Sequence, residues 1–367
     1  MATIRPFQNS DLPGIFEVWM RHWMAARQSP PVSVSILERA ILSRSFFRPT
    51  DLMVAVEDER VIAWAHSLSH ELSDEPDEDD GAPFRHESVA KSGAEDDLEN
   101  DAGQESARDG GETTAMLAAL CFADEPGIAV CDQLLRAVEA QLHREGVTRI
   151  DVGPVRDVSN GYSGLAPIGH GIGVPVSDAR TGSLLSRNGY HVARSVDRLA
   201  VQTSTYRPPV NRSFLQLRRS TRLDQTPLLP GSQRVAAAMS HFDLERHTLV
   251  DHQQQQMLAT CEFWLGDPEV QVMESSRAIL SLSPMGGRLY NGQPVPVPSK
   301  RFVDPESHEL SVECQFLISS LVQSLSNRQI LTVETAVDRD DRKLIEQLGQ
   351  LKFECVEQGK QWTKELG

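Results

Sequence analysis

Apolar and polar positions alternate along the first seventy residues in a way that predicts a strand, two helices and a hairpin. Residues 2–7 alternate with a period of two, as in a strand, and Ser10-Asp11 then precedes apolar residues at helical spacing through Trp23. A second helical pattern covers residues 34–44. Residues 52–56 and 61–68, separated by a short polar turn, predict a β-hairpin.

The pattern resumes after a long polar interruption. Residues 115–122 form a continuous apolar run typical of a buried strand, and residues 130–145 predict an amphipathic helix that ends at Gly146. Residues 147–152 predict another strand. A glycine-rich passage at 160–176 leads to a helix ending at Asn188-Gly189, and two strands are expected near residues 190–192 and 198–202.

The second half repeats this order of elements, with a period of about 180 residues. Its predicted elements, in chain order, are a strand at 214–219, a helix at 233–239, a hairpin from 246–251 and 257–264, a strand at 277–283, a helix at 314–326, a strand at 330–337, a helix at 342–351 and closing strands from 353. The sequence therefore predicts a mixed α/β (α+β) protein of two tandem domains, residues 1–203 and 211–367, joined by a stiff linker at 204–210.

The interruption, residues 73–112, changes how the net charge of −16 is interpreted. This segment holds fifteen acidic and three basic residues, so it carries −12 and the remainder of the chain only −4. It has too few apolar residues to offset the entropy of ordering, and we expect a disordered acidic insertion inside the first domain. No basic stripe is present, which argues against nucleic-acid binding.

The hydropathy of the chain and the spacing of its cysteines and histidines argue against several other classes of protein. No run of about 18 apolar residues predicts a membrane span, and the N-terminal residues lack the apolar core of a signal peptide. Five scattered cysteines without a CxxC pair, and histidines without ligand spacing, predict neither a disulfide framework nor a metal site. A cytoplasmic globular protein fits these features, and its oligomeric state is left open.

The order of elements resembles the GNAT fold of N-acetyltransferases, and the doubling resembles the tandem-GNAT proteins. The opening Thr3-Ile4-Arg5-Pro6-Phe7 and the passage Leu184-Leu185…Asn188-Gly189-Tyr190 look like family elements in the first half. Gly161-Tyr162-Ser163-Gly164-Leu165 is similar to a glycine-rich loop of some tandem members. In the second half, the corresponding passages are His247–Asp251 and Glu262-Phe263-Trp264.

This resemblance implies acetyl-CoA as co-substrate and a small-molecule or peptide amine as acceptor. A helix N-terminus can receive the pyrophosphate of coenzyme A through its unpaired N–H groups. In the family this turn follows the fourth strand, which here places the cofactor at the strand end and the following turn, with Pro126 and a cysteine where the family has a basic residue and a glycine. The expected cofactor residues are Leu120, Phe122, Gly127, Ile128, Ala129, Val130 and Cys131. The hypothesis requires free backbone amides at 127–131 and an open crevice beside them, and an ordinary strand-to-helix turn is the alternative.

Candidates for acid–base chemistry are weaker. The family tyrosine that protonates the leaving thiolate is replaced by Leu185 and Leu348 in the two halves. Tyr162 could substitute if its loop folds over the site, or it could simply pack in the turn. As bases we consider Asp124 and Glu125, which are otherwise solvated loop carboxylates, and Glu262, which lies within an apolar strand and faces either a cleft or solvent.

Two other functions remain in view. A non-catalytic acyl-CoA sensor or interaction scaffold would account for the degenerate turn and the missing tyrosines. A nicotinamide oxidoreductase would need a strand–turn–helix around Gly169-His170-Gly171-Ile172-Gly173, but Pro167 precedes this glycine run and no helix starts within it. We expect His170 to be a solvated loop residue.

Overall fold

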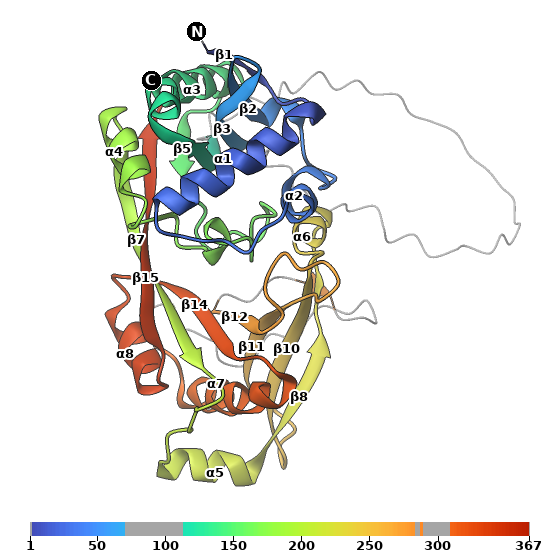
Figure 1. Ribbon diagram of the computed structural model, residues 1–367. Coiled ribbons are helices and arrows are strands. Elements are labelled where there is room, and N and C mark those ends of the chain that lie inside the picture. The colour runs from blue at the N-terminus through green and yellow to red at the C-terminus, as the bar shows by residue number, and fades with distance from the viewer. Residues whose placement is uncertain (1, 70–112, 283–286, 289–308, 367) are drawn as a thin grey trace, which may run out of the picture.

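The computed structural model describes residues 2–69, 113–282, 287–288 and 309–366 of the 367-residue chain. The predicted acidic insertion lies outside these residues. None of the helices within the described ranges has the length and apolar character that a membrane span requires. The remaining chain forms two repeats that share one sheet (Figure 1).

The first repeat follows the predicted order. Its strands and helices are β1 (Thr3–Pro6), α1 (Leu12–Ala25), α2 (Val34–Leu37), β2 (Leu52–Glu57), β3 (Arg60–Ser69), β4 (Thr114–Phe122), α3 (Asp124–Arg144), β5 (Arg149–Val152), β6 (Val174–Pro175), α4 (Ala179–Arg187) and β7 (His191–Gln202). The two strands expected at 190–192 and 198–202 are in fact the single strand β7.

The second repeat begins differently from the prediction. Its strands and helices are α5 (Arg212–Ser220), β8 (Thr221–Pro227), β9 (Leu229–Pro230), α6 (Gln233–Ala238), β10 (Phe242–Asp251), β11 (Met257–Gly266), β12 (Arg277–Ser281), β13 (Gly287–Arg288), α7 (Val312–Leu325), β14 (Thr332–Asp338), α8 (Arg342–Gln350) and β15 (Glu354–Glu365).

The expected strand at 214–219 is wrong, because these residues belong to helix α5. The side chain of Asn211 accepts a hydrogen bond from the Phe214 N–H at 2.7 Å, which caps the first turn of the helix. The strand of this region is β8, which comes directly after α5 and forms one edge of the sheet. Its polar sequence and largely exposed side chains explain why the hydrophobic pattern does not reveal it.

The sheet has thirteen strands. From one edge inwards, the strands of the second repeat follow nearly the same order as the strands of the first repeat follow from the other edge. The path runs β1-β2-β3-β4-β5-β15-β7-β14-β12-β11-β10-β8, with β6 paired to β15. Each repeat is therefore completed by the last strand of the other: β15 pairs with β5, and β7 pairs with β14. Figure 1 shows β15 running from one half of the molecule into the other.

Helices cover both faces of the first repeat. The predicted core residues Trp19 and Trp23 of α1 are buried against Trp64 of β3, and the α3 residues Leu134 and Leu135 pack on the opposite face. In the second repeat α7 covers one face of β10 and β11. The other face of these strands meets a loop from the first repeat, and this contact forms the site described next.

Candidate functional site

Each repeat contains one pair of parallel strands that separates part-way along its length. The β4–β5 ladder ends at the pair Leu117–Val152, although β4 continues to Phe122. The β12–β14 ladder ends at Ile279–Glu334, and both strands continue beyond it. Such a divergence opens the backbone edge of a strand to a ligand, so the two crevices are equivalent candidate sites.

The crevice of the first repeat is filled by the protein. Its remaining cavity measures about 20 Å³, which is room for about one water molecule. His22, near the end of α1, occupies the edge of β4: its Nδ1 accepts a hydrogen bond from the Phe122 N–H at 3.3 Å. Its Nε2 lies 3.0 Å from the carboxylate of Asp178, which caps α4.

The diphosphate site expected at residues 127–131 is not supported by this geometry. Helix α3 already begins at Asp124, so the Gly127 N–H donates to the Ala123 carbonyl at 3.1 Å within the first turn. The amides of 128–131 fall in the helix interior, where each N–H bonds to a carbonyl four residues earlier. Pro126, in the first turn, has no N–H to offer.

The side chains expected to contact the cofactor are also engaged elsewhere. Leu120, Phe122 and Cys131 are buried in the core between the sheet and α3, and Ile128 and Val130 pack against that core. Ala129 is exposed on the outer side of the helix. The first repeat therefore has the outline of the predicted site without the donors or the space that it needs.

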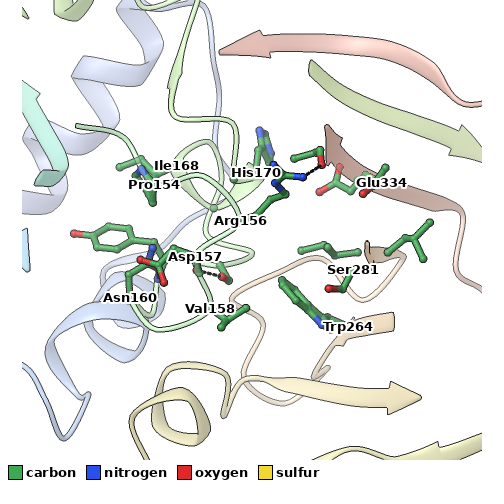
Figure 2. A pocket seen from close by; sticks show the side chains of 18 of the residues that line it. Pro154, Arg156, Asp157, Val158, Asn160, Ile168, His170, Trp264, Ser281 and Glu334 are labelled. Carbon is green, nitrogen blue, oxygen red and sulfur yellow. Dashed lines mark hydrogen bonds between the residues drawn. The ribbon is translucent and has the colours of Figure 1, made fainter. Parts of the chain in front are cut away.

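The crevice of the second repeat holds a cavity of about 310 Å³. Trp264 of β11 and Ile279 of β12 form an apolar wall, and Glu334 and Ala336 of β14 line the opposite strand. Figure 2 shows these side chains surrounding the cavity together with residues of the loop 153–173. The cavity is thus built from both repeats.

The loop 153–173, which contains the predicted glycine-rich passage, leaves the first repeat after β5 and lines the second repeat's crevice. Its fold is fixed by internal backbone hydrogen bonds, such as Gly169 N–H to the Leu165 carbonyl at 2.7 Å. A Cβ at Gly164, where φ is +80°, would lie 2.7 Å from the ring of Phe242 in β10. Glycine is therefore required where the loop docks on the second repeat.

The turn that follows β14 is short, since β14 ends at Asp338 and α8 begins at Arg342. The second repeat therefore sends no equivalent loop back to the first, and the two crevices differ for this reason.

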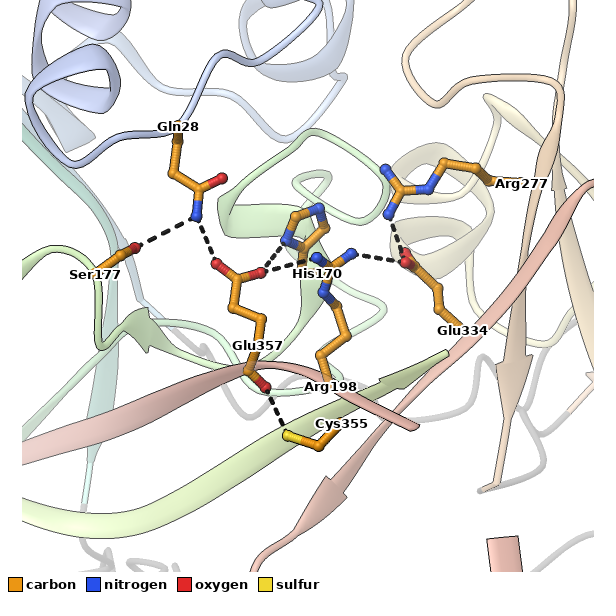
Figure 3. Close-up of polar contacts among 8 residues, drawn as sticks. All are labelled: Gln28, His170, Ser177, Arg198, Arg277, Glu334, Cys355 and Glu357. Atoms are coloured by element: carbon orange, nitrogen blue, oxygen red, sulfur yellow. Dashed lines mark hydrogen bonds and ion pairs between the residues drawn. The ribbon is translucent and has the colours of Figure 1, made fainter. Parts of the chain in front are cut away.

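A buried network of charges lies beside the cavity (Figure 3). Arg198 of β7 donates to Glu334 at 2.8 Å and lies 3.1 Å from Glu357 of β15. Arg277 of β12 also pairs with Glu334. Burial alone would raise the pKa of Glu334, but the charges of Arg277 and Arg198 outweigh burial and hold that pKa below its ordinary value.

His170 belongs to this network, which corrects the expectation of a solvated loop histidine. Its side chain is 7 % exposed, lines the cavity, and places Nδ1 2.9 Å from the Glu357 carboxylate (Figure 3). The two residues are 187 positions apart in sequence. No local signal in the sequence connects them, because they meet only where β15 enters the first repeat.

The candidate acid–base residues of the sequence are dispersed. Tyr162 is fully buried in the first repeat's core, and its hydroxyl lies 2.8 Å from His66 Nδ1, so it packs rather than acting as an exposed acid. Asp124 and Glu125 are the first residues of α3, and not loop residues as expected. Their helix belongs to the repeat whose crevice is filled.

Glu262 lies beside the cavity on the side of the second repeat, and Tyr162 lines the cavity from the loop 153–173. It is buried in β11 opposite Ser281, which lines the cavity, and it pairs with Arg246 of β10. The strand alternation puts it on the same face as Trp264. The sequence left open whether Glu262 faces solvent or a cleft, and the structure places it in the interior beside the cavity.

Among the described residues, no group of three or more histidine, cysteine, aspartate or glutamate side chains is arranged to hold a metal ion.

The architecture itself is shared with solved proteins. A tandem GNAT protein from the clavulanic acid biosynthesis pathway aligns over 100% of this chain and 99% of its own, with a TM-score of 0.57 and 11% identity. The chain has the tandem GNAT fold. A GCN5-related N-acetyltransferase from Sphaerobacter thermophilus aligns over 99% of this chain and 95% of its own, at a TM-score of 0.54 and 11% identity.

The same fold also occurs within a larger protein. The glucosamine N-acetyltransferase region of a fungal multi-domain β-N-acetylglucosaminidase matches 99% of this chain, with a TM-score of 0.60 and 10% identity, and the match covers 38% of that longer chain. No protein-family model matches this sequence, and no curated protein matches it. The GNAT fold is therefore evident from the structure and not from sequence similarity.

Proposed function

We propose that this protein is an N-acyltransferase that transfers an acetyl group from acetyl-CoA to an amine in the cavity between β12 and β14. The observation that carries this proposal is the contrast between the two crevices. At equivalent positions of one fold, the first is reduced to about 20 Å³ and the second holds about 310 Å³.

The second crevice fits the reactive end of the co-substrate. The pairing of β12 with β14 ends at the pair Ile279–Glu334, so the edge of β14 beyond Glu334 borders the cavity at Thr335 and Ala336. The arm of coenzyme A contains two amides, and an extended amide chain can pair with such an edge as an added strand does. The volume suits the acylated arm and an amine rather than the whole cofactor.

The lining of the cavity also suits a thioester and an amine. Trp264, Ile279 and Leu282 supply apolar surface for the acyl group, and Asp157, His170 and Glu334 supply polar groups at the other side. A mostly apolar site with a few placed polar groups is typical of small-molecule sites in enzymes.

The proposal is tested by filling the cavity. Ala336→Phe should lower the affinity for acetyl-CoA, measured by isothermal titration calorimetry, at least about tenfold, because one phenyl ring takes up space that the ligand needs. Ser281→Phe, which enters from the opposite strand, should do the same. Ala129→Glu, on the first repeat's exposed helix surface, is the matched control and should leave the affinity unchanged.

Thiol release from acetyl-CoA is then measured against a panel of amines. Wild-type affinity in both cavity variants, or a loss confined to Ala129→Glu, would place the co-substrate elsewhere and end this proposal.

A non-catalytic acyl-CoA sensor is the second candidate, and one observation favours it. Leu185 and Leu348, which stand where the family has its acidic tyrosine, are fully buried core residues and take no part in acid chemistry. A sensor would bind acetyl-CoA in the same cavity but release no thiol with any amine of the panel. Only thiol release in the presence of an amine therefore distinguishes the transferase from the sensor.

A further inference from the structure

His170 and Glu357 form a hydrogen-bonded pair at the wall of the cavity. The Nδ1 of His170 lies 2.9 Å from Glu357 Oε2, and only 7 % of the His170 side chain is exposed. An ionised carboxylate can only accept hydrogen bonds, so Nδ1 carries the proton of this contact. When the ring is neutral, its lone pair is therefore at Nε2, the nitrogen on the far side from Glu357.

That second nitrogen has no hydrogen-bond partner among the described residues. Buried polar atoms are nearly always paired, and unpaired ones gather where a ligand or a reacting group completes them. Nε2 itself is buried, but His170 lines the cavity, so a ligand that binds beside the ring can supply the missing partner.

The pairing is held in place by a carboxylate that stays ionised. Burial alone would raise the pKa of Glu357, but the hydrogen bond from His170 and the charge of Arg198 outweigh burial and hold the pKa below its ordinary value. Gln28, which follows α1, donates to the other carboxylate oxygen at 2.7 Å (Figure 3). Both oxygens of Glu357 are thereby fixed, and so is the plane of the His170 ring.

A second half-paired histidine shows why the cavity matters. His66 of β3 is bonded through Nδ1 to the Tyr162 hydroxyl and also has an unpartnered Nε2, but it is enclosed in the first repeat's core. Burial lowers the pKa of His66 to about 3. It has a phenol in place of a carboxylate, and it does not line the cavity between β12 and β14.

We propose that His170 is the general base that deprotonates the acceptor amine, and that Glu357 is the positioning residue that orients it. This inference rests on the transferase function proposed above. It assigns the base to a pair contributed by both repeats, the loop 153–173 and the exchanged strand β15.

The acceptor enters as an ammonium ion, and Nε2 of neutral His170 takes one proton to give the free amine and an imidazolium. The amine nitrogen attacks the thioester carbonyl carbon, the C–N bond forms, and the C–S bond breaks. The coenzyme A thiolate leaves with the electron pair and takes up the second proton, which the former amine nitrogen loses as it becomes the amide nitrogen. The products are the amide, the thiol and one proton, which His170 returns to solvent.

Charges near His170 from neighbouring strands are compensated by pairing. Glu357 of β15 and Glu334 of β14 face it, and Arg198 of β7 pairs with both, with Arg277 of β12 on Glu334. In the loop itself, Arg156 donates to Asp338 at 2.7 Å. The imidazolium formed in the reaction therefore gains the carboxylate of Glu357 as its direct counter-charge.

The protonation pattern can be tested without any turnover. Long-range ¹H–¹⁵N NMR spectra of the ¹⁵N-histidine-labelled protein at neutral pH report which ring nitrogen carries the proton, with His170→Gln identifying the signal. We expect His170 as the Nδ1–H tautomer. The Nε2–H tautomer, or a ring exchanging freely between the two, would overturn the proposal.

The kinetic test uses an amine from the panel that releases thiol with the wild-type protein. His170→Gln should lower kcat about 10²-fold or more, the contribution typical of a general base. Its acetyl-CoA dissociation constant should stay within about twofold. His252→Gln, in the exposed turn after β10, is the matched control and should retain wild-type kcat. Added imidazole should partly rescue His170→Ala but not change His252→Gln.

The positioning role of Glu357 is tested by measuring kcat and the acetyl-CoA dissociation constant of two variants. Glu357→Gln keeps an oxygen to accept from Nδ1 but loses the charge, and Glu357→Ala loses both, so kcat should fall in that order with acetyl-CoA affinity unchanged. If the wild-type protein is active and His170→Gln is equally active, the base is another group and the transferase proposal stands. If the wild-type protein binds no acetyl-CoA or releases no thiol with any amine, the transferase proposal fails first.

Discussion

His22 Nε2 lies 3.0 Å from Asp178 Oδ2, and this contact joins the end of α1 to the residue that caps α4 across the crevice of the first repeat. Both side chains are at most 1 % exposed. Burial alone would raise the pKa of Asp178, but the hydrogen bonds from His22 and Thr181 outweigh burial and lower it. The same histidine accepts a hydrogen bond from the Phe122 N–H, so one side chain occupies the edge of β4 at the crevice of the first repeat.

Removing this histidine should destabilise the protein. In His22→Ala the Asp178 carboxylate stays buried without its main partner, and breaking a buried pair in this way costs about 3 kcal/mol or more of unfolding free energy. Arg21→Ala, one residue away, loses an exposed contact with Glu17 and should change stability by less than about 0.5 kcal/mol. Urea unfolding followed by circular dichroism measures both. Equal stability of the two variants would show that the pair contributes little.

The filled crevice also sets the binding stoichiometry. Two repeats of one fold could hold two molecules of acetyl-CoA, but the geometry leaves space in the second repeat alone. We expect isothermal titration calorimetry of the wild-type protein to give one molecule per chain and a single binding phase. A second equivalent of acetyl-CoA bound with similar affinity would show that His22 and Trp23 move aside.

The order of elements could be read from the sequence because hydrophobic periodicity reports local structure. Apolar residues recur at helical spacing in α1 and α3, and β4 is one continuous apolar run, so each pattern indicates a helix or a strand. Trp19 and Trp23 were correctly expected in the core. The exposed edge strand β8 carries no such pattern. Nor does any local signal show that β15 inserts between β5 and β7, because this pairing joins residues far apart in the chain.

The site was harder to predict for the same reason. The turn around Gly127 resembles the family pattern in sequence, but the early start of α3 at Asp124 and the contact between His22 and Phe122 are tertiary features. The glycine-rich loop was recognised, whereas its role was not, because His170 becomes buried only when β15 brings Glu357 beside it.

Stability should fall when the pH is lowered from 6.5 to 5. Burial lowers the pKa of His66 to about 3, and burial with the charge of Arg44 lowers that of His241 to about 4, from an ordinary 6.5. In this window the unfolded chain binds protons at both histidines and the folded protein does not, so stability is complete above pH 6.5 and is lost as the pH falls.

The expected loss between pH 6.5 and 5 is about 2 kcal/mol from each histidine. Carboxylates of the unfolded chain titrate mainly below this window, so the change belongs largely to histidine. Urea unfolding at a series of pH values measures it, and His66→Gln should reduce the slope. A flat profile between pH 7 and 5 in the wild-type protein would contradict the buried neutral state of these rings.

Gly173 holds the end of the loop 153–173 against β15, and its substitution should be far more costly than that of a comparable glycine. Gly173 and Gly189 both have positive φ, +79° and +83°. A Cβ at Gly189 meets no atom within 4 Å, but one at Gly173 would approach the Lys360 carbonyl oxygen. Gly189→Ala should cost about 1 kcal/mol for its backbone conformation. Gly173→Ala should cost at least about 2 kcal/mol more and reduce thiol release, since it displaces the loop that carries His170. Equal unfolding free energies for the two variants would show that β15 shifts to make room for the added Cβ at little cost in stability.

Trp264 provides a test of the cavity from its apolar wall. Its indole N–H is buried and has no hydrogen-bond partner among the described residues, and the side chain lines the cavity opposite the loop (Figure 2). Trp264→Phe removes an unsatisfied donor, so the unfolding free energy of the ligand-free protein should change by less than about 1 kcal/mol. If that N–H donates a hydrogen bond to the acyl carbonyl or the amine, kcat/KM for acetyl transfer should fall about tenfold in Trp264→Phe, the equivalent of one hydrogen bond.

Trp362 of β15 also has a buried indole N–H without a hydrogen-bond partner among the described residues, but it lies against the first repeat's core and away from the cavity. Trp362→Phe is therefore the matched control, and an equal loss of kcat/KM in both variants would mean that the effect comes from packing and not from a contact with the ligand.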